Sequence, residues 1–390
     1  MMNMKWLEQW FEKIEPKGKW SWLGSTYEAF HTFAFTPKAV TRAGAHIRDA
    51  VDMKRSIIIV VIALVPALLF GMWNIGYQTA MSTGTDWHWM YMWWFGFLRM
   101  LPLIAVSYIV GLAIEFAFAQ YRHHEVNEGF LATGLLIPMI VPVTTPLWQL
   151  ALAVAFAVII CKEVFGGSGM NFLNPALVAR AFLFFAYPTH MSGDKVWVAA
   201  DLWGRDAIAG ATPMGELAAG AMPTASALDM LLGTIPGSTC ETSVIAIALG
   251  GLLLLFTGIA SWRIMLSVFL GGGAMGLLFN AIGGTTYLDL PFYYHFLLGG
   301  FAFGAVFMAT DPVTAAQTNA GKWIYGLLIG AFAVLLRVAN PAYPEGMMLS
   351  ILLMNCLAPL IDHCIVARNI KSRESRISRA SRTSRKEAQQ

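Results

Sequence analysis

Three acidic residues of this 390-residue sequence lie inside or beside long apolar segments, where charge is costly. Glu115 falls within one apolar segment, Asp311 directly follows another, and Asp362 stands near the end of a third. A carboxylate in or next to hydrocarbon usually marks a path for an ion or a proton. Hard oxygen ligands suit a small cation such as Na⁺ without transition-metal chemistry. We therefore expect these residues to line a cation path, with a helix cap as the alternative for Asp311, which precedes Pro312.

The stretch Asp206–Thr212 lies near the middle of the longest break between apolar segments. Gly210 and Ala211 are small, so the backbone before the Thr212 hydroxyl is open to close approach by a large group. The stretch is therefore a candidate binding site for such a group. An ordinary polar loop is the alternative, since an isolated Gly-Ala-Thr has no specificity of its own.

The tripeptide Asn-Pro-Ala occurs twice, at Asn174–Ala176 and Asn340–Ala342, each time after a helix that begins at a Trp. Asn suits the N-cap of a helix and Pro its first position. Two such helices would point their N-termini into the membrane from opposite sides and attract anionic or electron-rich groups. Two conventional helix starts without a ligand are the alternative.

The composition is that of a polytopic membrane protein. Hydrophobic residues make up 57% of the chain and charged residues 13%, whereas every helix of a soluble domain needs a polar face. Segments of about 20 apolar residues predict helices that cross a bilayer. We predict ten, at 56–74, 97–119, 130–146, 147–165, 175–189, 243–260, 264–283, 292–309, 323–339 and 347–366.

Similar features recur in the two halves of the chain and predict two five-helix repeats. Because five spans separate the copies, the second must be inverted in the membrane, as in many transporters. Ten spans place both termini on one side. Of the 26 Lys and Arg residues, all but Arg99, Lys195, Arg205 and Arg337 fall in the termini or at predicted inner loops and span ends, so that side is cytoplasmic.

These patterns divide the chain into five parts. The first carries Trp6, Trp10 and Ile14 at helical spacing and predicts an amphipathic helix on a membrane surface or in a partner's groove. The last has basic residues every two or three positions and predicts a disordered extension near anionic lipid. The parts are a cytoplasmic segment (1–55), a first repeat (56–189), an outer loop (190–242), a second repeat (243–366) and a basic cytoplasmic tail (367–390).

Several functions are excluded by what the sequence lacks. It contains no P-loop, no GxGxxG after a strand and no Ser/His/Asp arrangement. Its four cysteines have neither metal-ligand spacing nor a CxxC pair. The chain therefore has no nucleotide-hydrolysing site of its own, and a nucleic-acid role is not expected of a membrane protein.

Over nearly its whole length the sequence resembles the family of the B subunit of the bacterial Na⁺-translocating NADH:quinone oxidoreductases (Nqr). The D subunit of the Rnf electron-transport complex shares the membrane core, but the segment before the first span, with Tyr27–Phe30 and His46–Ala50, resembles the Nqr branch. The core motifs that carry the resemblance are Asn171-Phe172-Leu173-Asn174-Pro175-Ala176, Arg180-Ala181-Phe182, Met308-Ala309-Thr310-Asp311-Pro312-Val313, Gly321-Lys322-Trp323 and Asn340-Pro341-Ala342-Tyr343-Pro344-Glu345-Gly346.

The resemblance implies a covalent flavin. The family carries FMN as a phosphoester on the threonine of an Asp-x-x-Ser-Gly-Ala-Thr motif, installed by a flavin transferase. The motif maps onto Asp206, Gly210, Ala211 and Thr212, with Ala209 where Ser is usual. Covalent FMN is thus expected at Thr212, on the periplasmic face where the charge distribution also places this loop.

The resemblance also implies non-covalent riboflavin toward the cytoplasmic side and ubiquinone as electron acceptor. Asn171 and Asn174 are assigned to riboflavin, because amide groups can hydrogen-bond the edge of its ring. The Gly111 region is assigned to quinone, since a glycine lets a flat ring approach the helix backbone. The implied fold is similar to the urea-transporter-like inverted five-helix repeat.

The implied function is that of a translocase subunit in the bacterial inner membrane. It passes electrons from FMN through riboflavin to ubiquinone, coupled to Na⁺ movement along Glu115, Asp311 and Asp362. The implied partners are the A, C, D, E and F subunits of Nqr, the flavin transferase, membrane lipid, ubiquinone and Na⁺. The alternatives are a D subunit of the Rnf type and a passive inverted-repeat transporter or channel without a redox cofactor.

Overall fold

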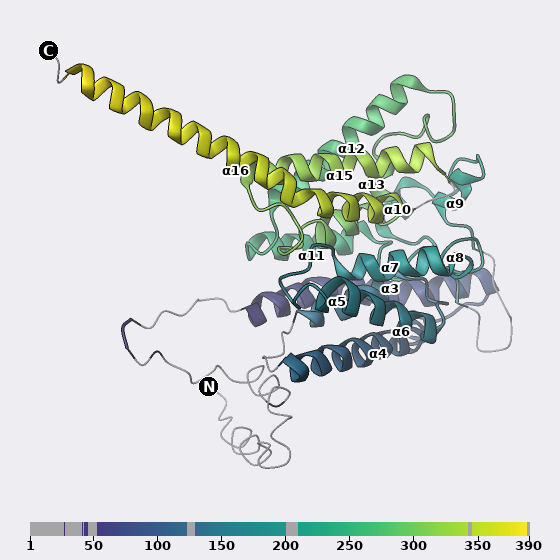
Figure 1. The fold of residues 1–390 in the computed structure, drawn as a ribbon. Coiled ribbons are helices and arrows are strands. Elements are labelled where there is room, and N and C mark those ends of the chain that lie inside the picture. The colour runs from purple at the N-terminus through teal and green to yellow at the C-terminus, as the bar shows by residue number, and fades with distance from the viewer. Residues whose placement is uncertain are drawn as a thin grey trace, which may run out of the picture. The chain divides into compact units, whose positions relative to one another are not determined.

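The computed structural model describes residues 27, 41, 43–45, 53–122, 129–199, 210–341 and 345–387, with side chains described as far as Arg376 (Figure 1). Within these ranges all regular secondary structure is helical, which confirms the predicted all-α class. The N-terminal amphipathic helix, Asp206 and Ala209 lie outside the described residues.

Large apolar side chains cover the outside of the long helices. Ile109 on the second of them is 68% exposed, and Phe256 at the end of a shorter one is 88% exposed. Hydrocarbon, rather than water, is the solvent that suits such surfaces. The chain is a membrane protein. The helices long and apolar enough to cross a bilayer are α3 (Met53–Thr83), α4 (Trp89–Arg122), α12 (Trp262–Ile282), α15 (Asn319–Ala339) and the part Gly346–Arg376 of α16 (Gly346–Glu387).

The other five predicted spans coincide with short or interrupted helices. Three of them have 11 to 13 residues, fewer than the roughly 20 that cross a bilayer. Proline is one cause, since Pro138 sits two residues before the end of the first and Pro175 begins the next. These helices are α5 (Phe130–Ile140), α6 (Leu147–Phe156) continued by the π-helix η2 (Ala157–Glu163), α7 (Pro175–Ala186), α11 (Val244–Phe256), and α13 (Tyr294–Leu297) followed by α14 (Phe301–Phe303) and the π-helix η3 (Gly304–Met308).

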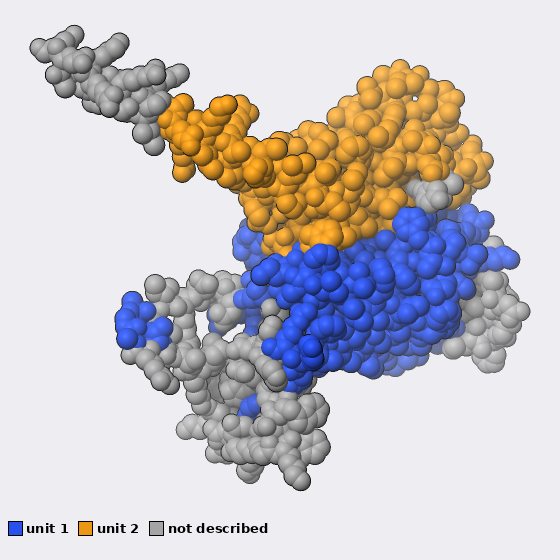
Figure 2. Space-filling view, in the orientation of Figure 1, with its two compact units in different colours: residues 1–171, 175–212, 228–259 blue, residues 172–174, 213–227, 260–390 orange. Residues whose placement is uncertain are grey.

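The first of two compact units comprises residues 1–171, 175–212 and 228–259 (Figure 2, blue). In it α3 packs against α4 and α11, and α4 packs against α5, α6 and η2. Helix α11 therefore groups with helices of the first half of the chain, although its sequence position predicted a place in the second repeat. The short helix α8 (Pro188–Met191) follows α7.

The second unit comprises residues 172–174, 213–227 and 260–390 (Figure 2, orange). Helix α15 packs against α12 on one side and α16 on the other. Glycines permit the first contact, because a Cβ on Gly330 or Gly271 would collide with the backbone of the facing helix. Small residues at such crossings are typical of helix pairs in membranes. The short helix α9 (Pro213–Ala218) belongs to this unit, and α10 (Ala227–Leu232) lies at its sequence boundary.

The basic tail differs from the expectation of disorder. Helix α16 continues without a break from Gly346 through Arg368 to Glu387, so the expectation was wrong for the described part of the tail. The physical reason is local: the segment from Arg368 onward contains neither Gly nor Pro, and its frequent Arg residues have high helix propensity.

Candidate functional site

Glu115 of α4 forms an ion pair in unit 1 with Lys162, the penultimate residue of η2. The two side chains are only 4% and 5% exposed. A second pair joins Arg122 Nη1, at the end of α4, to Glu163 Oε2 at 3.2 Å, and Arg122 Nη2 donates to the Glu163 backbone oxygen at 2.6 Å. We call Glu115, Arg122, Lys162 and Glu163 the charge cluster.

The charge cluster is formally neutral, because each helix contributes one acidic and one basic residue and each ion pair joins α4 to η2. Glu115 and Arg122 stand seven residues apart, so two turns of α4 place them on one face, and η2 supplies the opposite charges in adjacent positions. The π-helical turn is a wider turn that is frequent at functional sites. No local spacing predicts the pairing, because Lys162 stands 47 residues from Glu115.

A flat ring does lie against the backbone at Gly111, one turn before Glu115, but it belongs to Phe130 of α5. A Cβ on Gly111 would collide with this ring, and the ring centroid lies 5.9 Å from Lys162 Nζ. Tyr108 Oη donates to the Leu131 carbonyl at 2.6 Å, which fastens α4 to α5 at the same level. In this structure the space expected for quinone is therefore filled by Phe130, and the quinone assignment stays a prediction.

Two residues predicted for separate roles meet in unit 2. Asn174 Nδ2 donates to Asp311 Oδ2 at 3.4 Å. The same carboxylate accepts from Thr314 Oγ1 at 3.0 Å and from Val313 N at 3.1 Å, so Asp311 caps a turn and not a helix, and its place in a cation path stays a prediction. Desolvation raises the pKa of the Asp311 carboxyl, which lies beyond the predicted span 292–309, whereas these last two hydrogen bonds lower it. Asn171, the other residue assigned to riboflavin, is buried in unit 1.

Asn355 of α16 extends this polar chain into the core of unit 2. In the amide orientation that satisfies both of its groups, its nitrogen donates to Tyr325 Oη at 2.6 Å and to the Ile351 carbonyl at 3.3 Å, and its oxygen accepts from Asn174 N at 3.2 Å. Tyr325 and Asn355 are both fully buried. Sequence reasoning missed them, since neither stands in a recognisable motif.

Asp362 of α16 holds the N-terminus of α15. Its carboxylate accepts from Gln317 N at 2.6 Å, from Thr318 N at 3.0 Å and from Thr318 Oγ1 at 2.5 Å. Thr318 is itself the N-cap of α15. The carboxylate thus satisfies donors at a helix start, and its place in a cation path stays a prediction.

The described half of the Asp206–Thr212 stretch is held by its glycine. Gly210 N donates to the Asp194 carbonyl at 2.8 Å, and a Cβ at Gly210 would come within 2.5 Å of Val198 Cγ2. Ala211 is exposed and Thr212 half-exposed, directly before Pro213. Thr212 as the attachment residue for FMN stays a prediction.

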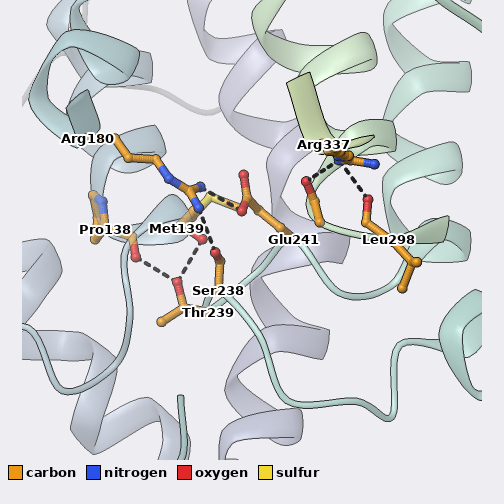
Figure 3. Close-up of polar contacts among 9 residues, drawn as sticks. Pro138, Met139, Arg180, Ser238, Thr239, Glu241, Leu298 and Arg337 are labelled. Atoms are coloured by element: carbon orange, nitrogen blue, oxygen red, sulfur yellow. Dashed lines mark hydrogen bonds and ion pairs between the residues drawn. The ribbon is translucent and has the colours of Figure 1, made fainter. Parts of the chain in front are cut away.

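A buried arginine of α7 organises the turn before α11. The sequence alone identified it only as part of a motif and as one of the basic residues of the inner side. Arg180 Nη1 lies 2.7 Å from Glu241 Oε2, and Nη2 donates to Ser238 Oγ at 3.2 Å (Figure 3). The Thr239 hydroxyl lies 2.7 Å from the carbonyl oxygen of Pro138 and as close to that of the next residue. Residues 238–241 thereby tie the end of α5 to α7.

We expect Arg180→Met to destabilise the protein by about 3–5 kcal/mol, because it leaves the Glu241 carboxylate buried without its charged partner. The double variant Arg180→Met, Glu241→Gln removes both charges and is expected to recover most of the loss. Thermal unfolding of the detergent-solubilised protein measures both. A single variant as stable as the wild type would show that the pair contributes nothing.

A second buried arginine holds an interrupted helix of unit 2. Arg337 of α15 donates to the carbonyl oxygen of Leu298 at 3.1 Å (Figure 3). It also donates to the carbonyl oxygens of His295 at 2.9 Å and Gly299 at 2.8 Å. These carbonyls lie in and just after α13, where the helix ends and its last acceptors lack helical donors. The arginine side chain therefore stabilises the break between α13 and α14.

Comparison with known proteins gives consistent matches. A family described as NQR2, RnfD, RnfE matches residues 40–371. The chain is similar to the B subunits of three Na(+)-translocating NADH-quinone reductases, with 48% identity for Ectopseudomonas mendocina, 46% for Klebsiella pneumoniae and 45% for Neisseria meningitidis serogroup A. Each alignment covers 95% of this chain and 97–99% of the relative.

Proposed function

The chain belongs to the NQR2, RnfD, RnfE family, and on this premise we propose that it acts as the membrane B subunit of a Na⁺-translocating NADH:quinone reductase. In that role it belongs to a translocase that couples quinone reduction to Na⁺ movement across a bacterial membrane. The observation that carries the proposal is 45–48% identity, over 95% of the chain, to relatives that bear this name.

FMN joined through its phosphate to the Thr212 hydroxyl would supply electron transfer at the outer face. The described residues suit such an attachment. Thr212 is half-exposed, and the backbone of Gly210 itself packs closely against Val198. Asp206, Gly210 and Ala211 complete the proposed attachment motif. A flavin transferase is the proposed maturation partner.

Riboflavin is assigned to Asn171 and Asn174, both of which are buried. The Asn174 amide donates to Asp311, so a residue proposed to hold the flavin ring also contacts a carboxylate proposed for cation passage. Ubiquinone is assigned to the neighbourhood of Gly111, where the Phe130 side chain would have to turn away to admit a second ring.

The proposed cation path uses Glu115, Asp311 and Asp362. Glu115 has the strongest support. Its carboxylate is only 4% exposed within an apolar helix, where a charge is costly and usually marks an ion or proton path. Asp311 and Asp362 have hydrogen-bond donors that stabilise their charge in place. Their part in the path is compatible with, but secondary to, these local roles.

The ten-span inverted repeat is proposed for the architecture. The five long apolar helices are accompanied by shorter ones that would enter the membrane without crossing it alone, which is the arrangement expected where broken helices build a transport site. Both termini are placed in the cytoplasm and the loop with Thr212 in the periplasm, in the inner membrane. The A, C, D, E and F subunits of Nqr and membrane lipid are the proposed partners.

A D subunit of the Rnf type and a passive channel are less well supported. The matched family includes RnfD, but the relatives at 45–48% identity carry the name of the Na⁺-translocating reductase and align across 95% of the chain.

NADH-driven Na⁺ uptake tests the function directly. We expect proteoliposomes holding the purified complex to accumulate Na⁺ when NADH and ubiquinone are added, and complex lacking this subunit to accumulate none. Uptake by the chain alone, without a redox substrate, would instead support the passive channel.

A further inference from the structure

The Glu115 carboxylate, which the proposed function assigns to Na⁺, is already paired with the positively charged side chain of Lys162. The proposed function does not require this pairing. Lys162 forms its ion pair with Glu115 in the interior of unit 1, where both side chains are at most 5% exposed. A carboxylate in that position cannot bind Na⁺ while an ammonium neutralises it, because a second positive charge would be buried without compensation.

The side-chain exposure of the charge cluster decreases along α4 from Arg122 to Glu115. Arg122 is 28% exposed and its partner Glu163 9%, whereas Glu115 and Lys162 are nearly closed off. Seven residues of helix separate Arg122 from Glu115, a rise of about 10 Å. A cation entering from the Arg122 end therefore meets Glu163 before it reaches Glu115.

Other groups that attract a cation lie near the Lys162 ammonium. While Lys162 is paired with Glu115, its ammonium already lies 5.9 Å from the centre of the Phe130 ring, and an aromatic face can hold a cation by its quadrupole. The Glu163 carboxylate, next in sequence, is shared with a partly exposed arginine that can turn toward solvent. Lysine is a compact charge on a flexible four-carbon stem, so it can move between acceptors in a way that the planar, branched arginine side chain cannot.

We propose that Lys162 is a tethered competitor for Na⁺ at Glu115. A Na⁺ ion binds the Glu115 carboxylate by displacing the ammonium toward Phe130 and Glu163, and the returning ammonium expels the ion. The Glu115 carboxylate is thus paired with a cation in both states, either with Na⁺ or with the Lys162 ammonium. This inference rests on the proposed function, because it needs Na⁺ to reach Glu115.

The test uses the intact complex and measures the Na⁺ concentration that half-saturates quinone reduction. Lys162→Gln removes the competing charge and is expected to lower that concentration about tenfold, since the competing charge lies at contact distance. Lys162→Arg keeps a positive charge and is the matched control, with no lowering expected. Subunit assembly and flavin content are measured on each variant to confirm that the complex is intact.

Lys162→Met guards against a Gln variant that fails to assemble. Methionine is unbranched and uncharged, so it also removes the competing ammonium. It is expected to lower the half-saturating Na⁺ concentration about tenfold, as Lys162→Gln does.

The outcomes separate the two proposals. A wild-type complex without Na⁺ dependence overturns the proposed function and this inference with it. A Na⁺-dependent wild type, together with an unchanged half-saturating concentration in an assembled Lys162→Gln or Lys162→Met variant, overturns the tethered competitor alone. Lys162 is then a structural partner of Glu115.

Discussion

Denatured subunit carrying Thr212→Val shows no flavin fluorescence on a gel, whereas the wild-type subunit, produced together with the flavin transferase, is fluorescent. This is the expected result if FMN is bound through Thr212, because valine has the shape of threonine without the hydroxyl that forms the phosphoester. The loss should be complete, since no noncovalent flavin survives denaturation. Thr212 is half-exposed, so substitution there leaves the core of the protein intact.

The matched control is Thr224→Val, in the same polar part of the chain. Thr224 is exposed and its hydroxyl donates to Glu216 at 2.7 Å, so the control also removes a hydroxyl near the surface. It is expected to retain full fluorescence. Fluorescence that persists in Thr212→Val would place the covalent flavin on another residue. Absence of fluorescence from the wild type would leave a silent scaffold or a passive conduit as the better account of the chain.

Glu115→Gln is expected to abolish the Na⁺ stimulation of quinone reduction in the intact complex, or to raise the half-saturating Na⁺ concentration by more than about tenfold. Glutamine keeps the size of the side chain and an oxygen ligand, but not the charge that attracts the cation. The measurement is ubiquinone reduction by NADH over a Na⁺ titration at constant ionic strength.

The same substitution also strands Lys162, so loss of stability must be separated from loss of the cation site. Glu241→Gln is the matched control, because Glu241 is likewise a buried carboxylate of unit 1 paired with a cation, Arg180 at 2.7 Å. Both variants are expected to unfold at lower temperature, but Glu241→Gln should keep its Na⁺ titration. Equal titrations for Glu115→Gln and the wild type would remove Glu115 from the cation path.

Local features of the sequence were sufficient to predict the structural class of the protein and its family. A predicted apolar span lies at each of the five long helices, because the length of an apolar run and the thickness of a bilayer decide a span. The resemblance to the Nqr family is confirmed by relatives at 45–48% identity. Motifs of adjacent residues, such as Gly210–Thr212, can be read without a structure because their chemistry needs no distant partner.

The lengths of the remaining helices could not be predicted in the same way. Helix α5 ends at Ile140, two residues before Pro142, which has no N–H to continue it. The Thr239 hydroxyl, from about 100 residues further along the chain, satisfies the carbonyls of its last turn. A helix can stop inside a membrane protein only where some other segment supplies such donors. Which segment provides these donors depends on how distant parts of the chain pack together.

The sequence by itself determined that this is an all-helical membrane protein of a known family, with acidic residues in or beside apolar segments and a threonine in a small-residue motif. Only the tertiary structure decided what those residues contact. It paired Glu115 with Lys162, filled the space at Gly111 with Phe130, and gave Asp362 a helix start to hold. The physical reason is that composition and spacing depend on neighbours in the chain, whereas the partner of a buried charge is chosen by which distant helix packs against it.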